Sequence, residues 1–363
     1  MWLYFFLEKR LKDKVYFTLN RKDKKVRPNP LRTRLCGIIV LAILLFVVAF
    51  VSSMIGVVNY SFTDVVSMIE ALFHSDGSMG MDYAIFWNIR MPRTVLSVLV
   101  GAALSVSGAA YQSVFRNPLT DPYILGVSSG ASLGAAIAIL LGWDNGIIGI
   151  GTMALVVGLV TVLLIYKIAS IGNRMHTATL LLTGVCFTFL ITAIVSFLMV
   201  LNQDKMERII FWTMGSFASA SWGDVLVALP FVVLGILITL YYSRDLNLLL
   251  VGSETAKTLG VDVEKVKKRL LFVTTLMVAF AVSTCGVIGF VGLIVPHCIR
   301  LVVGADNRLV IPYSIFVGGI FLLLCDSIAR MVLMPSELPV GSITALVGSP
   351  MFIYLLYKSK KQL

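Results

Sequence analysis

RNPLTDPYILGVSSGA, residues 116–131, separates two long apolar runs of the chain. Its first half contains two prolines and several polar residues, which is typical of a turn at a membrane surface. Its second half is rich in glycine and serine, which favours a helix that packs closely against its neighbours. Similar small residues fill the preceding run, at 101–110. Two interpretations stay open for these residues: tight helix packing, and the smooth, weakly polar wall of a transport pathway.

The composition is that of a polytopic membrane protein. Of 363 residues, 58% are hydrophobic and only 13% are charged, whereas about 25% are charged in soluble domains. A soluble protein this apolar could not cover its surface with polar groups. The five cysteines form no CxxC pair and the three histidines are scattered along the chain, so the sequence predicts no metal site.

A helix needs about 20 apolar residues to cross a bilayer, and ten segments meet or approach this length. They are 35–58, 94–114, 123–142, 146–166, 178–201, 224–242, 269–287, 290–305, 309–329 and 343–357. The eighth and the tenth are short. The sequence therefore predicts an all-α membrane protein, with a ten-helix transmembrane domain at residues 35–363 after a basic tail at residues 1–34.

The distribution of positive charge predicts the orientation. The tail contains eleven of the 30 Lys and Arg and only three acidic residues. With the tail inside, 25 of the 30 cations lie at cytoplasmic positions, in agreement with the positive-inside rule. We therefore expect both termini in the cytoplasm, and we interpret the tail as a segment that contacts anionic lipid rather than nucleic acid. The five cations that remain outside are Arg90, Arg93, Lys205, Arg208 and Arg330.

The largest inside segment after the tail reads GSETAKTLGVDVEKVKKR, residues 252–269. Its first part predicts one short helix, with Ser253 as the N-cap residue and Glu254 near the positive end of the helix dipole. Gly260 is suited to end this helix. A short, capped helix on the cytoplasmic face is typical of a docking element, and an ordinary structured connector stays open as the alternative.

No pattern for catalysis or nucleotide binding occurs in the chain. It has no GxxxxGK[ST] phosphate loop, no HExxH and no GxSxG. Asp326 is the only carboxylate well inside a predicted span, and its i,i+4 neighbour Arg330 favours a structural ion pair. Carriers driven by ion gradients usually have ionisable groups or broken helices at the midplane. We therefore expect no enzyme activity here, and an energy source outside the chain.

Four motifs, in order, resemble one family: the FecCD permeases of ABC importers for ferric siderophores, haem and cobalamin. They are RMPRT at 90–94, RNPLTDPYILGVSSGA at 116–131, GFVGLIVPHCIRLVVGADNR at 289–308 and SELPVGSITALVGSPMFIYLL at 336–356. With the inside loop that contains TLGV, the resemblance spans roughly residues 85–357. It implies the type II ABC importer permease fold, with ten helices and an inverted repeat that relates helices 2–5 to helices 7–10.

The resemblance also implies the partners and the cargo. The partners are a second permease copy or paralogue, two ATPase subunits that use ATP and Mg, an extracytoplasmic substrate-binding protein and the lipid of a bacterial cytoplasmic membrane. An iron(III)-siderophore is the expected cargo, because it is the commonest in the family, and haem or cobalamin is the alternative. Outside the family, the alternatives are an ion-gradient-driven secondary transporter, a zinc or manganese permease and a scaffold without transport.

Roles within the family carry over residue by residue. The outward arginines that accept carboxylates from the binding protein correspond to Arg90, Arg93 and Arg330. The residues of the coupling segment, 252–268, that fit the ATPase correspond to Glu254, Ala256, Leu259, Gly260 and Val261. A Ser/Thr pair that narrows the inner exit corresponds to His176 and Thr177, with histidine in place of a small hydroxyl. The remaining candidates for the pathway wall are Ser128 and Ser129.

Overall fold

The computed structural model describes residues 30–56, 58–70, 80–143, 149–171, 174–175, 177–334 and 336–360. Contacts divide the chain into two units, residues 1–39 and residues 40–363. Of the first unit, the structure describes only residues 30–39, which begin helix α2 (Pro30–Met54). Most of the predicted basic tail therefore lies outside the described residues, and its boundary at residue 34 stays a prediction.

The described part of the second unit is helical, apart from a two-residue antiparallel ladder of β1 (Ser170–Ile171) and β2 (Arg174–Met175). After α2, its helices are α3 (Phe62–Glu70), α4 (Met81–Ile85), the π-helix η1 (Phe86–Arg90), α5 (Met91–Val114), the 3-10 helix η2 (Pro122–Leu125), α6 (Val127–Leu141), α7 (Ile150–Ala169), α8 (Thr177–Leu201), α9 (Gln203–Thr213), α10 (Trp222–Tyr241), α11 (Ser243–Val251), α12 (Ser253–Thr258), α13 (Val263–Cys285), α14 (Val291–Val303), α15 (Asn307–Met331) and α16 (Val340–Lys360).

Each of the ten predicted spans coincides with a helix. Within the described residues, seven helices are long and apolar enough to cross a membrane: Cys36–Met54, Met81–Val114, Ile150–Ala169, Thr177–Leu201, Trp222–Tyr241, Val263–Cys285 and Asn307–Met331. The other three, in α6, α14 and α16, are apolar but shorter. The sequence predicts short eighth and tenth spans, but it does not predict that the third is short.

The third span is short because its first turn is not α-helical. Pro122–Leu125 forms the separate 3-10 helix η2, whose N-cap residue Asp121 accepts a hydrogen bond from the Tyr123 backbone N–H at 2.8 Å. Gly126 then adopts a left-handed conformation with φ 73°, and α6 begins only at Val127. A continuous helix from residue 123 is therefore a wrong prediction.

The second span is longer than predicted. It forms one run of 34 helical residues, Met81–Val114, in which α4, η1 and α5 follow one another without a break. Arg90 and Arg93 lower the local hydropathy, so the sequence places the start of the span at residue 94. Both arginines in fact lie inside the helix and are buried.

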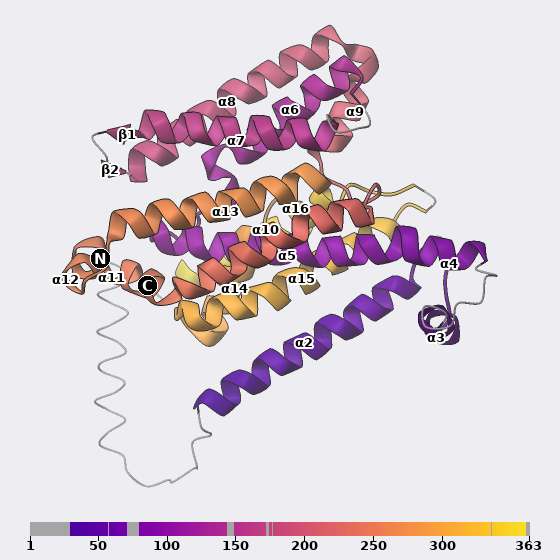
Figure 1. Ribbon diagram of the computed structural model, residues 1–363, viewed down its shortest axis with the longest axis horizontal. Coiled ribbons are helices and arrows are strands. Elements are labelled where there is room, and N and C mark those ends of the chain that lie inside the picture. Colours follow the sequence, from indigo (N-terminus) through magenta and orange to yellow (C-terminus); the bar gives the residue numbers. More distant parts are fainter. Residues whose placement is uncertain are drawn as a thin grey trace. The chain divides into compact units, whose positions relative to one another are not determined.

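Helix α5 lies at the centre of the second unit, surrounded by α10, α13, α14 and α15 (Figure 1). Its small residues allow backbone-to-backbone contact with two neighbours. A Cβ atom added at Gly108 would overlap the Gly292 carbonyl of α14, and one added at Gly101 would overlap the Gly318 carbonyl of α15. The Ser105 hydroxyl donates to the Ser314 carbonyl at 2.6 Å. In α5, the small residues therefore serve close helix packing.

Helices α6, α7 and α8 lie side by side as a second group (Figure 1). Glycines also permit the contact between α6 and α7, since a Cβ atom at Gly134 would overlap the backbone of Met153 and Ala154. Helix α13 packs against both α5 and α7, so it joins this group to the central helix.

The contact at Gly108 predicts a sharp effect on stability. The substitution Gly108→Ala would force α5 away from α14, with an expected loss of about 1 to 3 kcal/mol, as for other overpacked cores. The temperature of half-unfolding in detergent measures this loss. Gly223→Ala is the matched control, because Gly223 also lies in a helix and a Cβ atom there would meet only the Ser221 hydroxyl, at an ordinary contact distance of 3.4 Å. Equal unfolding temperatures for the wild type and Gly108→Ala would contradict the expected effect.

Candidate docking and transport sites

The three predicted docking arginines lie together at one end of the second unit, around a buried carboxylate. Arg93 donates to both carboxylate oxygens of Asp326, with distances of 2.8 to 3.1 Å. Its Nη1 atom donates to both carboxylate oxygens of Glu337, at 2.8 and 2.9 Å. The Asp326 side chain is fully buried, whereas that of Glu337 is 28% exposed. Arg93 therefore joins α5 to α15 and to the segment before α16.

Arg330 and Arg90 extend this cluster to the end of α2. Arg330 forms an ion pair with Asp326 at 3.2 Å, and its Nη atoms donate to the carbonyls of Ile55 and Ser52. Arg90 donates to the carbonyls of Ser53 and Val58 and lies over the Tyr60 ring, 4.3 Å from its centroid. The negative end of the α2 dipole faces these cations, which is a favourable arrangement.

We call Arg90, Arg93, Arg330, Asp326 and Glu337 the arginine cluster. Its three arginine residues are only 5–7% exposed. The Asp326–Arg330 pair expected from the sequence is present. The two carboxylate contacts of Arg93 join residues 233 and 244 positions apart in the chain, so no local pattern could have shown them. Glu337 is the member of the cluster that sequence reasoning missed.

Helix α12 lies in the coupling segment, between α11 and α13. It ends in a Schellman motif, in which the N–H groups of Gly260 and Val261 donate to the carbonyls of Lys257 and Ala256. Gly260 has φ 87°, which only glycine adopts without strain. Its expected role as the end of the helix is therefore confirmed. The N-cap residue is Gly252 and not Ser253, which is the first residue of the helix.

The coupling residues divide between a buried and an exposed face. Ala256 is fully buried and belongs to the main hydrophobic core, and Val261 packs against that core. In contrast, Leu259 is 61% exposed and Glu254, which pairs with Lys257 at 2.8 Å, is also exposed. An exposed leucine on a firmly anchored short helix is a feature that a protein partner can bind.

Asp262 caps the helix that follows the coupling residues. Its carboxylate accepts a hydrogen bond from the Lys265 backbone N–H at 3.2 Å and pairs with the Lys265 side chain at 2.8 Å. These hydrogen bonds hold the pKa of the Asp262 carboxyl below its usual value. The cap therefore stays ionised near neutral pH, where it fixes the start of α13.

A partly buried polar network connects α11, which precedes the coupling segment, to the central helices. Asn247 of α11 donates to Asp306 and accepts from the backbone N–H of Asn307, both at 2.7 Å. The Asn307 side chain in turn accepts hydrogen bonds from Arg300 of α14 at 2.9 Å and from Ser113 of α5 at 3.0 Å. We call these five residues the asparagine network, and it ties α11 to α5, α14 and α15.

The predicted pathway residues occupy different environments. Ser129 is buried and donates to the Gly126 carbonyl at 3.0 Å, whereas Ser128 is half-buried. Thr177 is half-buried and begins α8. His176 lies outside the described residues. These assignments stay predictions, with Ser128 and Thr177 as the more accessible candidates. Within the described part of the chain, no group of three His, Cys, Asp or Glu side chains could hold a metal ion.

The arginine cluster and the asparagine network lie at opposite ends of α5. Arg93 is in the first turn of this helix and Ser113 is in the last. A helix of 24 residues is about 36 Å long, comparable to the thickness of a membrane. The two candidate sites are thus separated by the length of one transmembrane helix.

Comparison with known proteins identifies the family of the chain. Residues 43–358 match the FecCD transport family. The chain is 48% identical to a cobalamin import system permease of Halobacterium salinarum, with 74% of this chain and 72% of that protein covered. It is 37% identical to a hemin transport system permease of Yersinia pestis, with 89% and 95% covered.

A solved structure has the same fold. It is described as an inward-facing conformation of a metal-chelate type ABC transporter, and it superposes with a TM-score of 0.77 at 33% identity, covering 88% of this chain and 98% of that one. The described helices thus form a type II importer permease fold, in a multi-pass membrane protein that is not itself an enzyme. The family match covers most of the sequence, so the chain belongs to the FecCD transport family of ABC importer permeases.

Proposed function

We propose that this chain is the permease of an ATP-driven importer whose cargo is a cobalamin. The chain belongs to a family of ABC importer permeases for metal chelates, haem and cobalamin. The 48% identity with a cobalamin permease supports cobalamin over the iron(III)-siderophore, which was expected from the sequence because it is the commonest cargo of the family. The 37% identity with a hemin permease makes haem the second candidate.

Helix α12 is the feature that carries the transport mechanism. It presents exposed Leu259 to a partner while Ala256 anchors it in the core. An ATPase subunit bound to Leu259 would pull on α12, and the asparagine network would pass the movement to the central helices. Such coupling needs no ionisable group at the midplane. An ion-gradient carrier would leave this anchored but exposed helix without a role.

Docking of the binding protein is proposed at the arginine cluster. The side chain of Glu337 is the cluster's more exposed carboxylate, and it occupies the same two-oxygen position on Arg93 that a partner's carboxylate would take. We infer that docking exchanges Glu337 for a carboxylate of the binding protein, while buried Asp326 stays bound to Arg93 and Arg330. Exchange would let nearly buried arginines take part without leaving any of them unpaired.

The proposed assembly contains two permease chains, identical or paralogous, two ATPase subunits and one extracytoplasmic binding protein in a bacterial cytoplasmic membrane. Each permease crosses the membrane ten times, with both termini in the cytoplasm and helices 2–5 related to helices 7–10 by an inverted repeat. The charge distribution supports this orientation, because it places the coupling segment inside and the arginine cluster outside.

The coupling role of Leu259 predicts loss of the ATPase. Leu259→Ser removes an exposed apolar side chain, so the affinity for the ATPase should fall by about tenfold or more, because burial of a leucine side chain contributes about 1.5 to 3 kcal/mol. Co-purification of the ATPase with the permease measures this change. Val302→Ser is the control, since Val302 is also exposed and lies in α14 near the asparagine network. Full retention of the ATPase by Leu259→Ser would contradict the role of α12.

The exchange at Arg93 predicts opposite effects of two substitutions. Glu337→Gln weakens the internal competitor, so the binding protein should bind more tightly, by up to about fivefold, the value of a partly exposed ion pair. Arg93→Gln should weaken binding. Surface plasmon resonance on the permease in nanodiscs measures both.

The matched control for Glu337→Gln is Asp204→Asn. Asp204 is an exposed acid at the start of α9, on the expected outer side, and it is remote in sequence from the cluster. A general effect of negative charge would appear equally in both variants. Weaker binding of the binding protein to Glu337→Gln would exclude the exchange of carboxylates on Arg93. It would show instead that Glu337 itself contributes to binding.

The cargo is tested with the reconstituted permease–ATPase complex. Its binding protein is added empty and then loaded with cobalamin, haem or a ferric siderophore, and ATP hydrolysis is measured. We expect cobalamin to give the strongest stimulation. Stimulation by haem or siderophore alone would show that the cargo is not cobalamin, while the importer mechanism would still hold. No ATPase binding and no response to any ligand would exclude the importer mechanism.

A further inference from the structure

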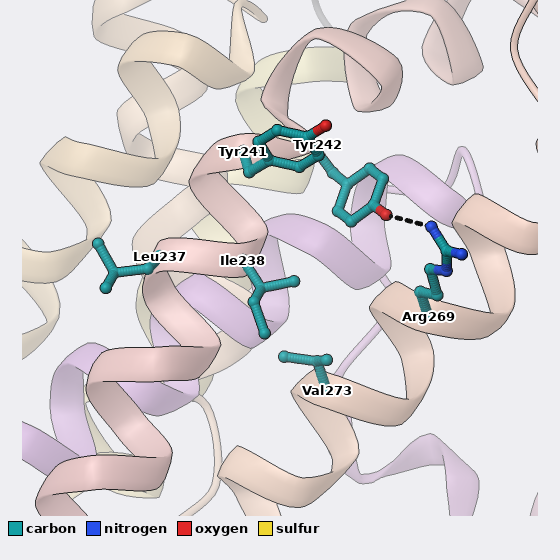
Figure 2. A pocket seen from close by; sticks show the side chains of 6 residues that line it. All are labelled: Leu237, Ile238, Tyr241, Tyr242, Arg269 and Val273. Carbon is teal, nitrogen blue, oxygen red and sulfur yellow. Dashed lines mark hydrogen bonds between the residues drawn. The ribbon is translucent and has the colours of Figure 1, made fainter.

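An open groove of about 500 Å³ lies between α10 and α13. Figure 2 shows its walls, in which Ile238 and Val273 face one another across the gap and the Tyr242 ring points toward Arg269. The remaining lining residues are Leu237 and Tyr241, and both are more than half exposed. Neither the ATPase docking role nor the arginine cluster uses this groove.

The groove changes from apolar to polar along its length. Leu237, Ile238 and Val273 make one end of the groove apolar, whereas the Tyr242 hydroxyl and the Arg269 guanidinium lie at its other end, joined by a hydrogen bond of 2.8 Å (Figure 2). The sequence changes at the same level. Residues 225–242 and residues 270–285 carry no charge, and Arg244 and Arg269 are the first charges beyond them.

This gradient is that of the membrane–water interface. Tyrosines such as Tyr241 and Tyr242 concentrate where a transmembrane helix leaves the hydrocarbon layer. Arg269 stands at this level, with its guanidinium exposed. Among the described residues, its one hydrogen bond engages Nη1 only. The rest of its planar fork of donors is suited to the oxygens of a phosphate.

A second groove shows what the cation adds. It lies between α2 and α5, has a volume of about 360 Å³ and has an uncharged, mostly apolar lining that includes Leu45, Phe46 and Leu99. Lipid chains can fill it, but no charged group in its lining would distinguish one headgroup from another. The groove between α10 and α13 has an apolar floor of the same kind together with an arginine at the interface.

We propose that the groove between α10 and α13 binds an anionic phospholipid. One acyl chain lies against Leu237, Ile238 and Val273, and the phosphate contacts Arg269, which Tyr242 orients. The site lies at the end of the molecule where Lys and Arg gather, so the lipid comes from the leaflet next to the coupling segment. Residues 243–262 connect α10 to α13 and contain α12. The bound lipid therefore also holds together the two helices on either side of the segment that contains α12.

Native mass spectrometry of the purified chain tests this site. The chain is titrated in detergent with phosphatidylglycerol and with phosphatidylcholine of the same acyl chains. We expect the wild type to retain phosphatidylglycerol preferentially, and Arg269→Gln to reduce this preference about fivefold, the effect of one cation near an anionic surface. Tyr242→Phe should reduce it less, because the arginine remains but is no longer oriented.

Two further variants separate the site from general effects. Arg308→Gln removes another exposed cation outside the groove lining, and it should leave the preference unchanged. Val273→Trp fills the groove without changing any charge, and it should reduce retention of both lipids. Equal loss in Arg308→Gln and Arg269→Gln, or full retention by Val273→Trp, would overturn the proposal. If Val273→Trp changed the number of permease copies per particle without loss of lipid, the proposal would also be overturned. The groove would then be an interface with a second permease copy.

Discussion

The structure depends on the contact of α5 with α14 and α15 at glycine positions. With backbones this close, α5 has no room for large side chains on those faces, and its hydroxyl groups must bond within the helix layer. Ser105 meets this demand through the Ser314 carbonyl, and Ser113 through Asn307. The same close packing makes α5 a rigid connection between its two ends. The arginine cluster at one end and the asparagine network at the other are therefore mechanically linked through this helix.

The arginine cluster shows how cations persist at the end where the positive-inside rule disfavours them. A nearly buried guanidinium is costly unless it is paired and hydrogen-bonded. Asp326 lies between Arg93 and Arg330 and neutralises part of their charge, and carbonyls at the end of α2 accept further hydrogen bonds from Arg90 and Arg330. Three arginines and two carboxylates leave one positive charge. An acidic partner would thus meet a preformed, slightly positive surface and not three free cations.

The sequence predicted the helices well because hydropathy reports local composition, and each apolar run became a helix. It failed where a distant partner decides the outcome. The sequence places Arg90 and Arg93 just before the start of the second span. Contacts with Asp326 and with the α2 carbonyls nevertheless allow both arginines to lie inside the helix. Gly126 read as one more small residue, but its left-handed conformation separates η2 from α6. Glu337 could not be found because its partner lies 244 residues away. The boundary of α12 was predicted to within one residue, since its end depends on glycine alone.

The two ends of the molecule differ in how they can respond to a partner. At the arginine cluster, an exchange of carboxylates on Arg93 would need little movement, so the proposed docking there would not require the helices to change position. At the other end, α11 is bound to the start of α15 through Asn247, and Asn307 binds both Arg300 and Ser113. A displacement of α11 must either move α5, α14 and α15 with it or break these partly buried hydrogen bonds, each worth about 0.5 to 1.5 kcal/mol. Rigid movement is the less costly outcome, and it would convert the proposed closure of an ATPase into a change along the whole of α5.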